Sequence, residues 1–182
     1  MIKFNFPAML LLTYTPRKDV DLEKYENWLR EVDNPFFNNV KGISHYTNWK
    51  IIKKNKNLKF SYFDFLAFEN INLFDSVWNS KEVVDFTASW RKLWGQAPNN
   101  EDLSLNAMVY LLENTRNQSL IIDKQISINF FLNKIKFNDQ NQLWKLNKSL
   151  RNEAFFNYFV ISKKKSRLSK SFWADGEIVA SP

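Results

Sequence analysis

Two hydrophobic periods alternate along the first 113 residues, and they predict the order of strands and helices there. Residues 8–15 form an apolar run, closed by a proline, that is typical of a strand. Apolar side chains then recur at helical spacing over residues 22–32, behind aspartates that can cap a helix. Because proline disfavours helical geometry in the residue before it, Pro35 predicts that this helix ends at about Asp33.

After a Lys-Gly turn, apolar residues recur at every second position. Residues 43–52 and 58–68 each alternate as a strand, and the polar loop between them completes a predicted hairpin. In the second of these strands, Tyr62 and Asp64 share one face while Phe63 lies on the other. Asp64 therefore interrupts an aromatic run and is expected to lie among rings.

Helical spacing returns over residues 73–94. Residues 74–78 indicate a short helix, Ser80 can cap a second one, and Gly95 is a suitable stop for it. Residues 105–112 then alternate as a further strand. The resulting order, β-α-β-β-α-β, is the ferredoxin-like pattern of an α+β protein.

The remaining third of the chain begins again with a strand-like run, at residues 126–137. Residues 140–154 predict an amphipathic helix, and two further strands, 155–162 and 171–180, flank the basic turn KKKSR. This β-α-β-β order predicts a partial repeat of the first unit.

A comparison of the chain with itself supports the repeat. The segment IIKKNKNLKFSYF lies over ISKKKSRLSKSFW without a gap, with five identical positions and two aromatic pairs. A short Lys-rich hairpin can also match by chance in such a composition. We therefore expect a ferredoxin-like domain at residues 1–115 and, at residues 116–182, a C-terminal β-α-β-β extension or partial second repeat.

Aromatic content is the most unusual property of the composition. Phe, Trp and Tyr make up 16% of the residues, with 17 Phe and 7 Trp. Aromatic rings bury large areas and line apolar pockets. The surplus therefore belongs in a core, a subunit interface or a ligand cavity.

The formal net charge of +7 could attract nucleic acid or an anionic surface. Two Lys-rich turns, KKNKNLK and KKKSR, lie beside aromatics, so a nucleic-acid-binding sheet is an alternative, although a Lys- and Asn-rich composition explains the charge more simply. Cysteine is absent, which excludes disulfides and suits a cytoplasmic protein. The apolar run at residues 9–12 is too short for a membrane span, so we expect no membrane association.

From Tyr25 to Gly95 the chain carries, in order, YxxWLREVDNPFF, KGIxHY, FDFLAFE and a Trp-rich helix. This order resembles the EthD-like and RedY/HapK-like branches of the dimeric α+β barrel superfamily, and the resemblance covers about the first 113 residues. EthD-like members often carry a histidine just before the proline that ends the first helix. This chain has Asp33-Asn34-Pro35 there, which makes the RedY-like branch the nearer relative.

The resemblance implies an architecture more firmly than a reaction. In that superfamily two ferredoxin-like sheets pack face to face into a barrel, and small hydrophobic metabolites often bind between each sheet and its helices. Its members include cofactor-free oxygenases, isomerases, decarboxylases and dehydrating or cyclising enzymes. A homodimer is therefore expected, unless the partial repeat covers the sheet within one chain.

His45, the single histidine, is the first candidate catalytic residue, because an imidazole can transfer protons near neutral pH. Asp33 and Asp64 are the other candidates, since either could orient His45 or act as an acid, and a carboxylate among rings should have a raised pKa. The structural alternatives are a hydrogen-bonded strand histidine and carboxylates paired with Arg30, Arg91 or backbone amides. With one histidine and no cysteine, we expect no metal site.

The sequence thus predicts a cofactor-independent enzyme that acts on a small apolar or aromatic metabolite by dehydration or cyclisation, isomerisation or oxygenation. The metabolite is expected to lie against aromatic side chains, namely Tyr14, Trp28, Tyr46, Trp49, Tyr62, Trp78 and Trp90. A non-catalytic ligand-binding or assembly protein of the same fold is the alternative.

Overall fold

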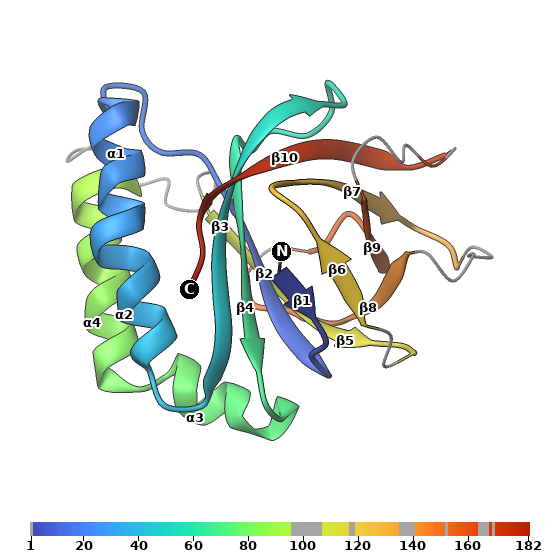
Figure 1. Cartoon of the computed structure of the whole chain (residues 1–182), viewed down its shortest axis with the longest axis horizontal. Coiled ribbons are helices and arrows are strands. Elements are labelled where there is room, and N and C mark those ends of the chain that lie inside the picture. The colour runs from blue at the N-terminus through green and yellow to red at the C-terminus, as the bar shows by residue number, and fades with distance from the viewer. Residues whose placement is uncertain are drawn as a thin grey trace.

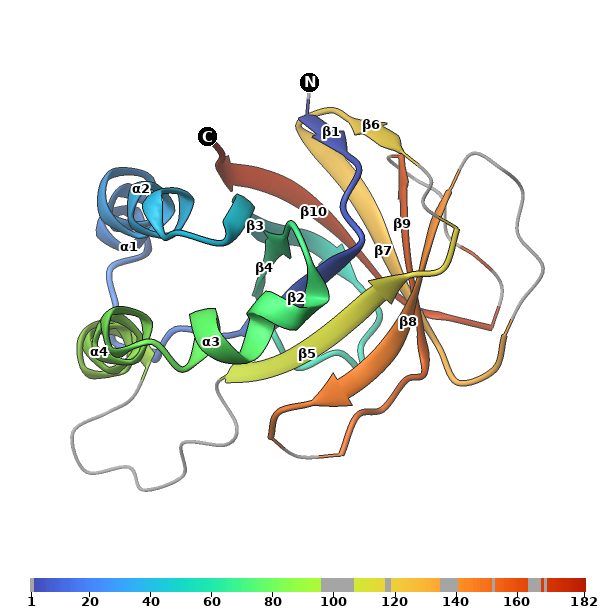
Figure 2. The same ribbon diagram turned by 90° about the horizontal axis from the view of Figure 1, so that it is seen from below.

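The computed structural model describes residues 2–95, 107–116, 119–134, 141–151, 153–163, 168 and 170–182. Within them, eight strands close a barrel and a layer of helices lies along one side of it (Figures 1 and 2). The α+β class expected from the sequence is confirmed.

The barrel strands are β2 (Ala8–Tyr14), β3 (Ile43–Lys54), β4 (Tyr62–Phe68), β5 (Ala107–Asn114), β7 (Gln125–Phe131), β8 (Gln142–Ser149), β9 (Tyr158–Lys163) and β10 (Phe172–Ala180). Two short strands, β1 (Ile2–Phe4) and β6 (Leu120–Ile122), pair with each other outside the barrel order, and the sequence pattern did not reveal them. The helical segments are α1 (Leu22–Trp28), a π turn (Leu29–Asp33), α2 (Asn34–Asn39), a 3-10 turn (Ile71–Leu73), α3 (Phe74–Trp78), α4 (Lys81–Trp90) and a second π turn (Arg91–Gly95).

Neighbouring strands run antiparallel around the barrel in the order β10-β3-β4-β2-β5-β8-β9-β7. The strands of the N-terminal half are contiguous in this order, and so are those of the C-terminal half. Two seams, β5 with β8 and β10 with β3, join the halves. The sheet of each half therefore finds its partners within one chain.

Inward-facing side chains fill the barrel as a single cluster. Its largest members include Trp49, Phe63, Phe65, Trp144 and Phe159, all of them fully buried. The β1–β6 ribbon contributes to the same cluster. Much of the aromatic surplus of the sequence is thus core, which stabilises the barrel by removing large apolar surfaces from water.

The helices cover the outer face of the N-terminal strands. Figures 1 and 2 show α1 and α2 end to end as one helix, with α4 beside it, against β3, β4 and β2. In β4, Leu66 and Phe68 pack toward this layer while Phe63 and Phe65 point into the barrel, as the alternation predicted. Asp64 consequently faces the helices.

The first helix does not end at Asp33, and that prediction was wrong. The chain passes from α1 through the π turn directly into α2, where Pro35 occupies the first turn. The backbone N–H of Asn34 donates to the backbone carbonyl of Leu29, five residues back. The wider π turn and a position in the first turn accommodate a proline, which has no N–H to donate.

The helix predicted over residues 140–154 is also wrong, because Gln142–Ser149 forms strand β8. Leu143, Leu146 and Leu150 have helical spacing, but pairing with β5 and β9 prevails over this local period. The C-terminal third is therefore all-β within its described residues, rather than β-α-β-β. Residues 164–167 of the basic turn lie outside them.

In the described part of the chain, no helix combines the length and the apolar character that a membrane span needs.

Candidate active site

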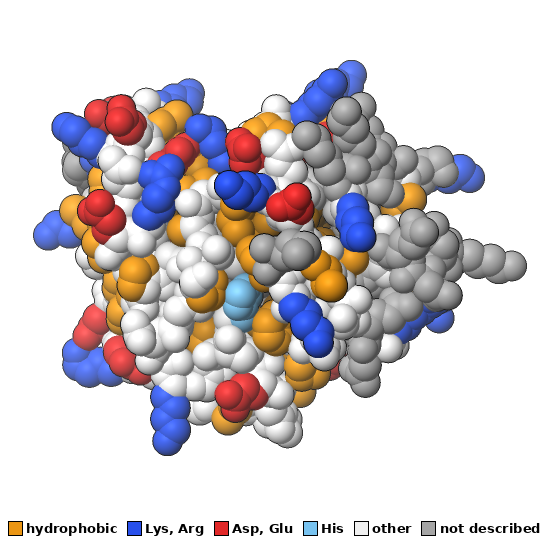
Figure 3. Space-filling view, in the orientation of Figure 1, with side chains coloured by type: hydrophobic (Ala, Val, Ile, Leu, Met, Phe, Trp, Pro, Cys, Tyr) orange, Lys and Arg blue, Asp and Glu red, His pale blue; other side chains and the backbone are white. Residues whose placement is uncertain are grey.

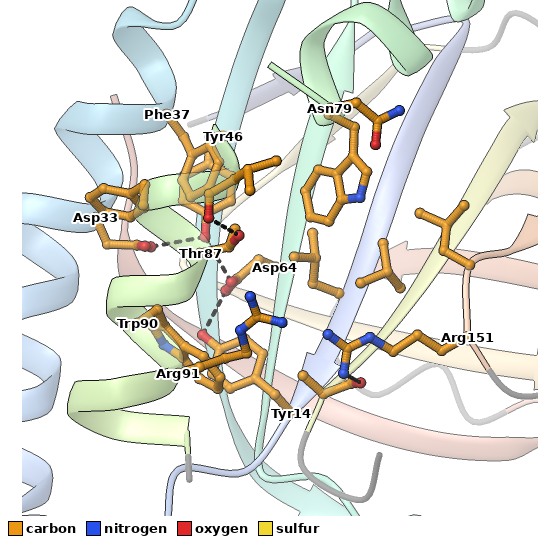
Figure 4. Close-up of a pocket in the computed structure, with 17 residues that line it drawn as sticks. Tyr14, Asp33, Phe37, Tyr46, Asp64, Asn79, Thr87, Trp90, Arg91 and Arg151 are labelled. Atoms are coloured by element: carbon orange, nitrogen blue, oxygen red, sulfur yellow. Dashed lines mark hydrogen bonds between the residues drawn. The ribbon is translucent and has the colours of Figure 1, made fainter. Parts of the chain in front are cut away.

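A cavity of about 270 Å³ lies between the helix layer and the outer face of the N-terminal strands (Figure 4). Its floor comes from β2, β3, β4 and β5, and its walls from α2, α3 and α4. The side chains that line it are Leu12, Tyr14, Asp33, Phe37, Tyr46, Asp64, Trp78, Asn79, Val84, Phe86, Thr87, Trp90, Arg91, Ala107, Val109, Leu150 and Arg151. Most are apolar or aromatic, so the few polar groups define where chemistry can occur.

Two carboxyl groups meet at one hydroxyl in this cavity. The Tyr46 hydroxyl oxygen lies 2.8 Å from Oδ2 of Asp33 and 2.8 Å from Oδ2 of Asp64. Tyr14 donates its hydroxyl to Oδ1 of Asp64 at 3.0 Å. Nδ2 of Asn48 lies 2.8 Å from Asp33 Oδ2 and 3.0 Å from the Tyr46 oxygen (the dashed lines in Figure 4 mark the contacts among residues drawn there).

The number of protons in this network follows from its geometry. Tyr46 has one hydroxyl proton and can donate it to only one carboxylate. The second 2.8 Å oxygen–oxygen contact therefore requires a proton on the other carboxyl group. Asp33, Tyr46 and Asp64 thus share protons as one unit.

Burial has the largest effect on the acidity of this unit. It raises the pKa of Asp33 to about 7. Hydrogen bonds from Tyr46 and Asn48 lower this pKa, but by less than burial raises it. The pKa of Asp64 is raised well above its usual value, first by burial and then by the negative charge of Asp33. Asp64 is therefore the better proton holder of the two. Neither carboxylate forms an ion pair with a described residue.

Tyr46, and Tyr14 beside the unit, are held as neutral donors. Burial, followed by the negative charges nearby, raises the pKa of Tyr14 and of Tyr46 well above 10. Tyr14 also stacks on Tyr62 at a centroid distance of 5.9 Å. Both hydroxyl groups therefore keep their protons near neutral pH.

Asparagines anchor the π turn that carries Asp33. Asn34 donates to the backbone carbonyl of Tyr46 and to the side chain of Asn48, at 3.1 and 3.0 Å. Asn38 accepts from the backbone amide of Tyr46 at 2.8 Å. These bonds satisfy the backbone N–H and carbonyl groups of Tyr46, which lie beyond Asn48, where the pairing of β3 with β10 ends. They fix the π turn against the strand, and with it the position of Asp33.

His45 lies outside this unit. Its ring stacks on Phe6 at 5.4 Å and meets Phe4 edge-on at 5.7 Å, and it does not line the cavity. Burial lowers the pKa of His45, whose Nε2 is buried without a hydrogen-bond partner among the described residues. Figure 3 shows the imidazole near the middle of the face viewed in Figure 1, between hydrophobic side chains. The structure therefore does not bring His45 to Asp33 or Asp64.

The aromatic residues expected to hold a substrate divide into two groups. Tyr14, Tyr46, Trp78 and Trp90 line the cavity. The others lie in different layers: Trp28 stacks on Phe86 within the helix layer, Trp49 is inside the barrel, and Tyr62 donates to Glu26 at the edge of α1.

Several cavity residues were missed by the sequence analysis. Asn48, which bonds to Asp33 and Tyr46 from behind the cavity lining, could have been found from the period of two, which places it on the same face of β3 as Tyr46. Arg151 had no usable signal because its segment was predicted to be a helix. Arg91 was considered only as a partner for a carboxylate, whereas it lines the cavity.

Sequence comparison adds a family to this geometry. The family described as REDY-like protein HapK matches residues 9–100, half of the chain. The chain belongs to the REDY-like HapK family. The matched segment includes Asp33, Tyr46 and Asp64, so the proton-sharing unit of this HapK-family chain lies wholly within it. No curated protein matches the chain.

Two solved structures resemble the HapK-family chain over 98% of its length. One is an anthrone oxidase-like protein, at 7% identity and a TM-score of 0.56, with 93% of that chain covered. The other is a proposed monooxygenase from Fusobacterium nucleatum, at 8% identity and a TM-score of 0.51, with 94% covered. At these identities the likeness shows the fold alone.

The described residues contain no group of three or more histidine, aspartate or glutamate side chains arranged to hold a metal ion. Asp33 and Asp64 instead direct their oxygens at hydroxyl and amide donors. The arrangement can accept a proton on one carboxylate and return one from the other, beside an apolar surface large enough for a small aromatic ring system.

Proposed function

We propose that the chain is an enzyme that moves protons on a small aromatic metabolite in the cavity under the helices, without a cofactor. The observation that carries the proposal is the carboxyl pair bridged by the Tyr46 hydroxyl and facing that cavity. Two carboxyl groups with raised pKa values, in a site lined by rings, are the arrangement that acid–base catalysis near neutral pH needs.

Asp33 acts as the base in this proposal. With a pKa of about 7 it is partly ionised near neutral pH and can take a proton from a weakly acidic C–H or O–H group. Asp64 is the acid, and its proton reaches the cavity directly or through the Tyr46 hydroxyl. The rings of Phe37, Phe86 and Trp90 exclude water from the bound substrate.

Oxygenation is the reaction class we favour, and the names of the two structural neighbours support it. The oxidation of a hydroxyanthrone shows how atoms and electrons would balance in such a reaction. Asp33 removes a proton from its reduced ring carbon, the resulting carbanion passes electrons to O₂, and the net change is anthrone plus O₂ to anthraquinone plus water. Because the substrate supplies all the electrons, this reaction requires no external reductant. Dehydration, cyclisation or isomerisation would begin with the same proton transfer.

The substrate in this proposal is held by Tyr14, Tyr46, Trp78 and Trp90, whereas Trp28 stacks on Phe86, which also lines the cavity. A catalytic part for His45 remains a prediction. Because its ring lies against Phe4 and Phe6, it would have to act at a different place from the carboxyl pair.

We further propose that the two halves are repeats of one ferredoxin-like unit. Counted from the first barrel strand of each half, the order around the barrel is second, third, first, fourth in both halves. The C-terminal copy, within residues 116–182, lacks helices among its described residues. Its sheet takes the place that a second chain would occupy in a dimer.

The homodimer expected from the sequence remains a prediction, and native mass spectrometry tests it. A monomer has a mass of 21.8 kDa, and a dimer would have twice that mass. An internal second sheet removes the original reason for dimerisation, so a dimer would have to form through another surface.

The proton transfer can be tested apart from oxygenation. In anaerobic D₂O, the wild type should accelerate exchange of the C10 protons of 1,8-dihydroxyanthrone, as followed by NMR. In air it should accelerate O₂ uptake and anthraquinone formation. Asp33→Asn should lower both rates by roughly two orders of magnitude or more, since acid–base groups contribute about 10²–10⁴-fold.

Asp75→Asn, on α3 and away from the cavity, is the control for removing one carboxylate. Exchange and oxidation at the wild-type rate in both Asp33→Asn and Asp64→Asn would refute the proposed chemistry. Exchange without oxidation would retain the acid–base site and remove the oxygenase class.

A further inference from the structure

Two guanidinium groups line the same cavity as the carboxyl pair. Arg91 begins the π turn that follows α4, and Arg151 lies just after β8. In Figure 4, Arg151 lies on the side of the cavity opposite Asp33, with Arg91 between them. One arginine therefore comes from the N-terminal half and the other from the C-terminal half.

The two cations are close enough to influence each other. Burial, and then the positive charge of Arg91, lowers the pKa of Arg151. Arg151 donates to the backbone carbonyl of Ala107 at 3.2 Å, which holds its side chain at the cavity edge. The guanidinium of Arg91 has no hydrogen bond or ion pair with any residue that the structure describes. Like charges that share a half-enclosed site favour an anion between them.

The cavity is therefore electrically polar along its length. Carboxyl groups occupy the region around Asp33 and Asp64, Arg151 occupies the opposite side, and Arg91 lies between them. A ligand with one anionic group would be repelled at the carboxyl end and attracted at the arginine end. Such a site selects one of the two orientations of a flat aromatic molecule.

We propose that Arg91 and Arg151 together bind a carboxylate of the substrate, which is an aromatic acid. Guanidinium groups recognise carboxylates through paired hydrogen bonds that an ammonium group cannot reproduce. Binding there places the ring system over the apolar walls and its opposite edge at the proton-sharing unit. This inference rests on the proposed function, whose substrate class it names, and it gives the C-terminal half a part in substrate selection.

The test compares two ring probes that differ only in charge, 2-naphthoate and the neutral 2-naphthamide, by isothermal titration calorimetry. The wild type should bind 2-naphthoate at least about tenfold more tightly, and added salt should reduce this preference. Arg91→Gln and Arg151→Gln should each weaken 2-naphthoate binding about tenfold and leave 2-naphthamide unchanged. Arg91→Lys should retain part of the preference, since it keeps the charge and loses the paired geometry.

The matched controls are Lys92→Gln and Lys148→Gln. Each removes one exposed positive charge close in sequence to an arginine of the pair, without touching the cavity. Both should bind the two probes as the wild type does. Melting temperatures of all variants verify that the fold is retained.

Equal affinity of the wild type for both probes, or equal loss of both probes in the arginine variants, would overturn the carboxylate assignment and leave the aromatic cavity intact. Failure of both probes to bind would overturn the assignment together with the aromatic site. These binding results are independent of turnover, whereas the proposed chemistry fails separately if Asp33→Asn and Asp64→Asn retain proton exchange.

Discussion

The carboxyl groups of Asp33 and Asp64 are separated by a single hydroxyl oxygen, that of Tyr46, at 2.8 Å from each. One aspartate comes from a π turn in the helix layer and the other from the centre of a barrel strand. The contact thus joins the two layers of the fold through groups that must share protons. Its energy depends on pH.

The first prediction concerns stability against pH. Folding raises the pKa of Asp33 from its usual value to about 7, so the folded state binds its proton more tightly than the unfolded state does. The stability that this provides is present below the unfolded pKa, near 3.8, and is lost as the pH rises to about 7. The free energy of unfolding should therefore fall by a few kcal/mol over this interval, in urea denaturation.

Asp33→Asn should reduce this pH dependence, because an amide does not titrate, and Asp64, whose pKa is also raised, should supply the part that is left. Asp75→Asn, on the exposed side of α3, should keep the wild-type slope. The same slope in Asp33→Asn and in the wild type would show that Asp33 does not titrate with a raised pKa.

The second prediction concerns the bridge itself. Tyr46→Phe removes the oxygen that both carboxyl groups contact and leaves them buried with fewer partners. We expect a loss of about 1–3 kcal/mol in the free energy of unfolding at pH 8, and less at pH 5, which is below the raised pKa of Asp33. Tyr158→Phe, whose half-buried ring lies on β9 away from the cavity, is the control. Equal losses at the two pH values would contradict the shared-proton account.

The third prediction concerns the close approach of Gly95 and Trp90. A Cβ atom at Gly95 would lie 2.2 Å from the Trp90 ring, which lines the cavity. Gly95→Ala should displace the indole at a cost of about 1–3 kcal/mol in stability and weaken the binding of aromatic probes. Ser89→Ala, on the exposed side of α4, serves as the control in thermal unfolding and probe titration. Unaltered probe binding in Gly95→Ala would show that the binding of aromatic probes does not depend on the position of the Trp90 ring.

The fourth prediction concerns His45, whose resonances are the only imidazole signals of the chain. Burial lowers its pKa, so an NMR titration should give a midpoint below 6.5. The sign is opposite to that of Asp33. The stability contributed by neutral His45 is present above 6.5 and is lost as the pH falls from 6.5 through the lowered pKa of the folded state, because the unfolded chain takes up the proton first.

A midpoint at or above 6.5 would contradict the buried neutral imidazole. The predicted catalytic part of His45 has its own test, because His45→Gln should slow turnover if the imidazole transfers a proton. Unchanged turnover would remove that role.

The N-terminal half was largely predictable because its local signals and its tertiary environment agree. Alternation assigned the two faces of β4 correctly and placed Asp64 opposite Phe63. The prediction failed where tertiary packing overrode a local sequence preference. Pro35 did not stop the first helix, because a π turn accommodated it. Leu143 and Leu146 joined a strand because Leu143 pairs with β9 and Leu146 with β5.

The candidate site was predictable only in part. Asp33 and Asp64 were selected one at a time from their aromatic surroundings, and the structure brings them together. Their link through Tyr46 needs the register of β3 against β4, in which Tyr46 lies opposite Leu66 and Asn48 opposite Asp64. Local periodicity does not supply such a register. Arg151 reaches the cavity from the other half of the barrel, which no short-range pattern could have indicated.

The single helix layer limits how the molecule can respond to its ligand. Helices stand over the strands of one half, whereas the described strands of the other half form barrel wall without such a cover. Binding should therefore saturate at one molecule per chain along a simple hyperbola, and a monomer would have no equivalent site through which a Hill coefficient above one could arise. A duplicated barrel arranged in this way can change its C-terminal copy to alter selectivity while the proton-transfer groups of the first copy stay as they are.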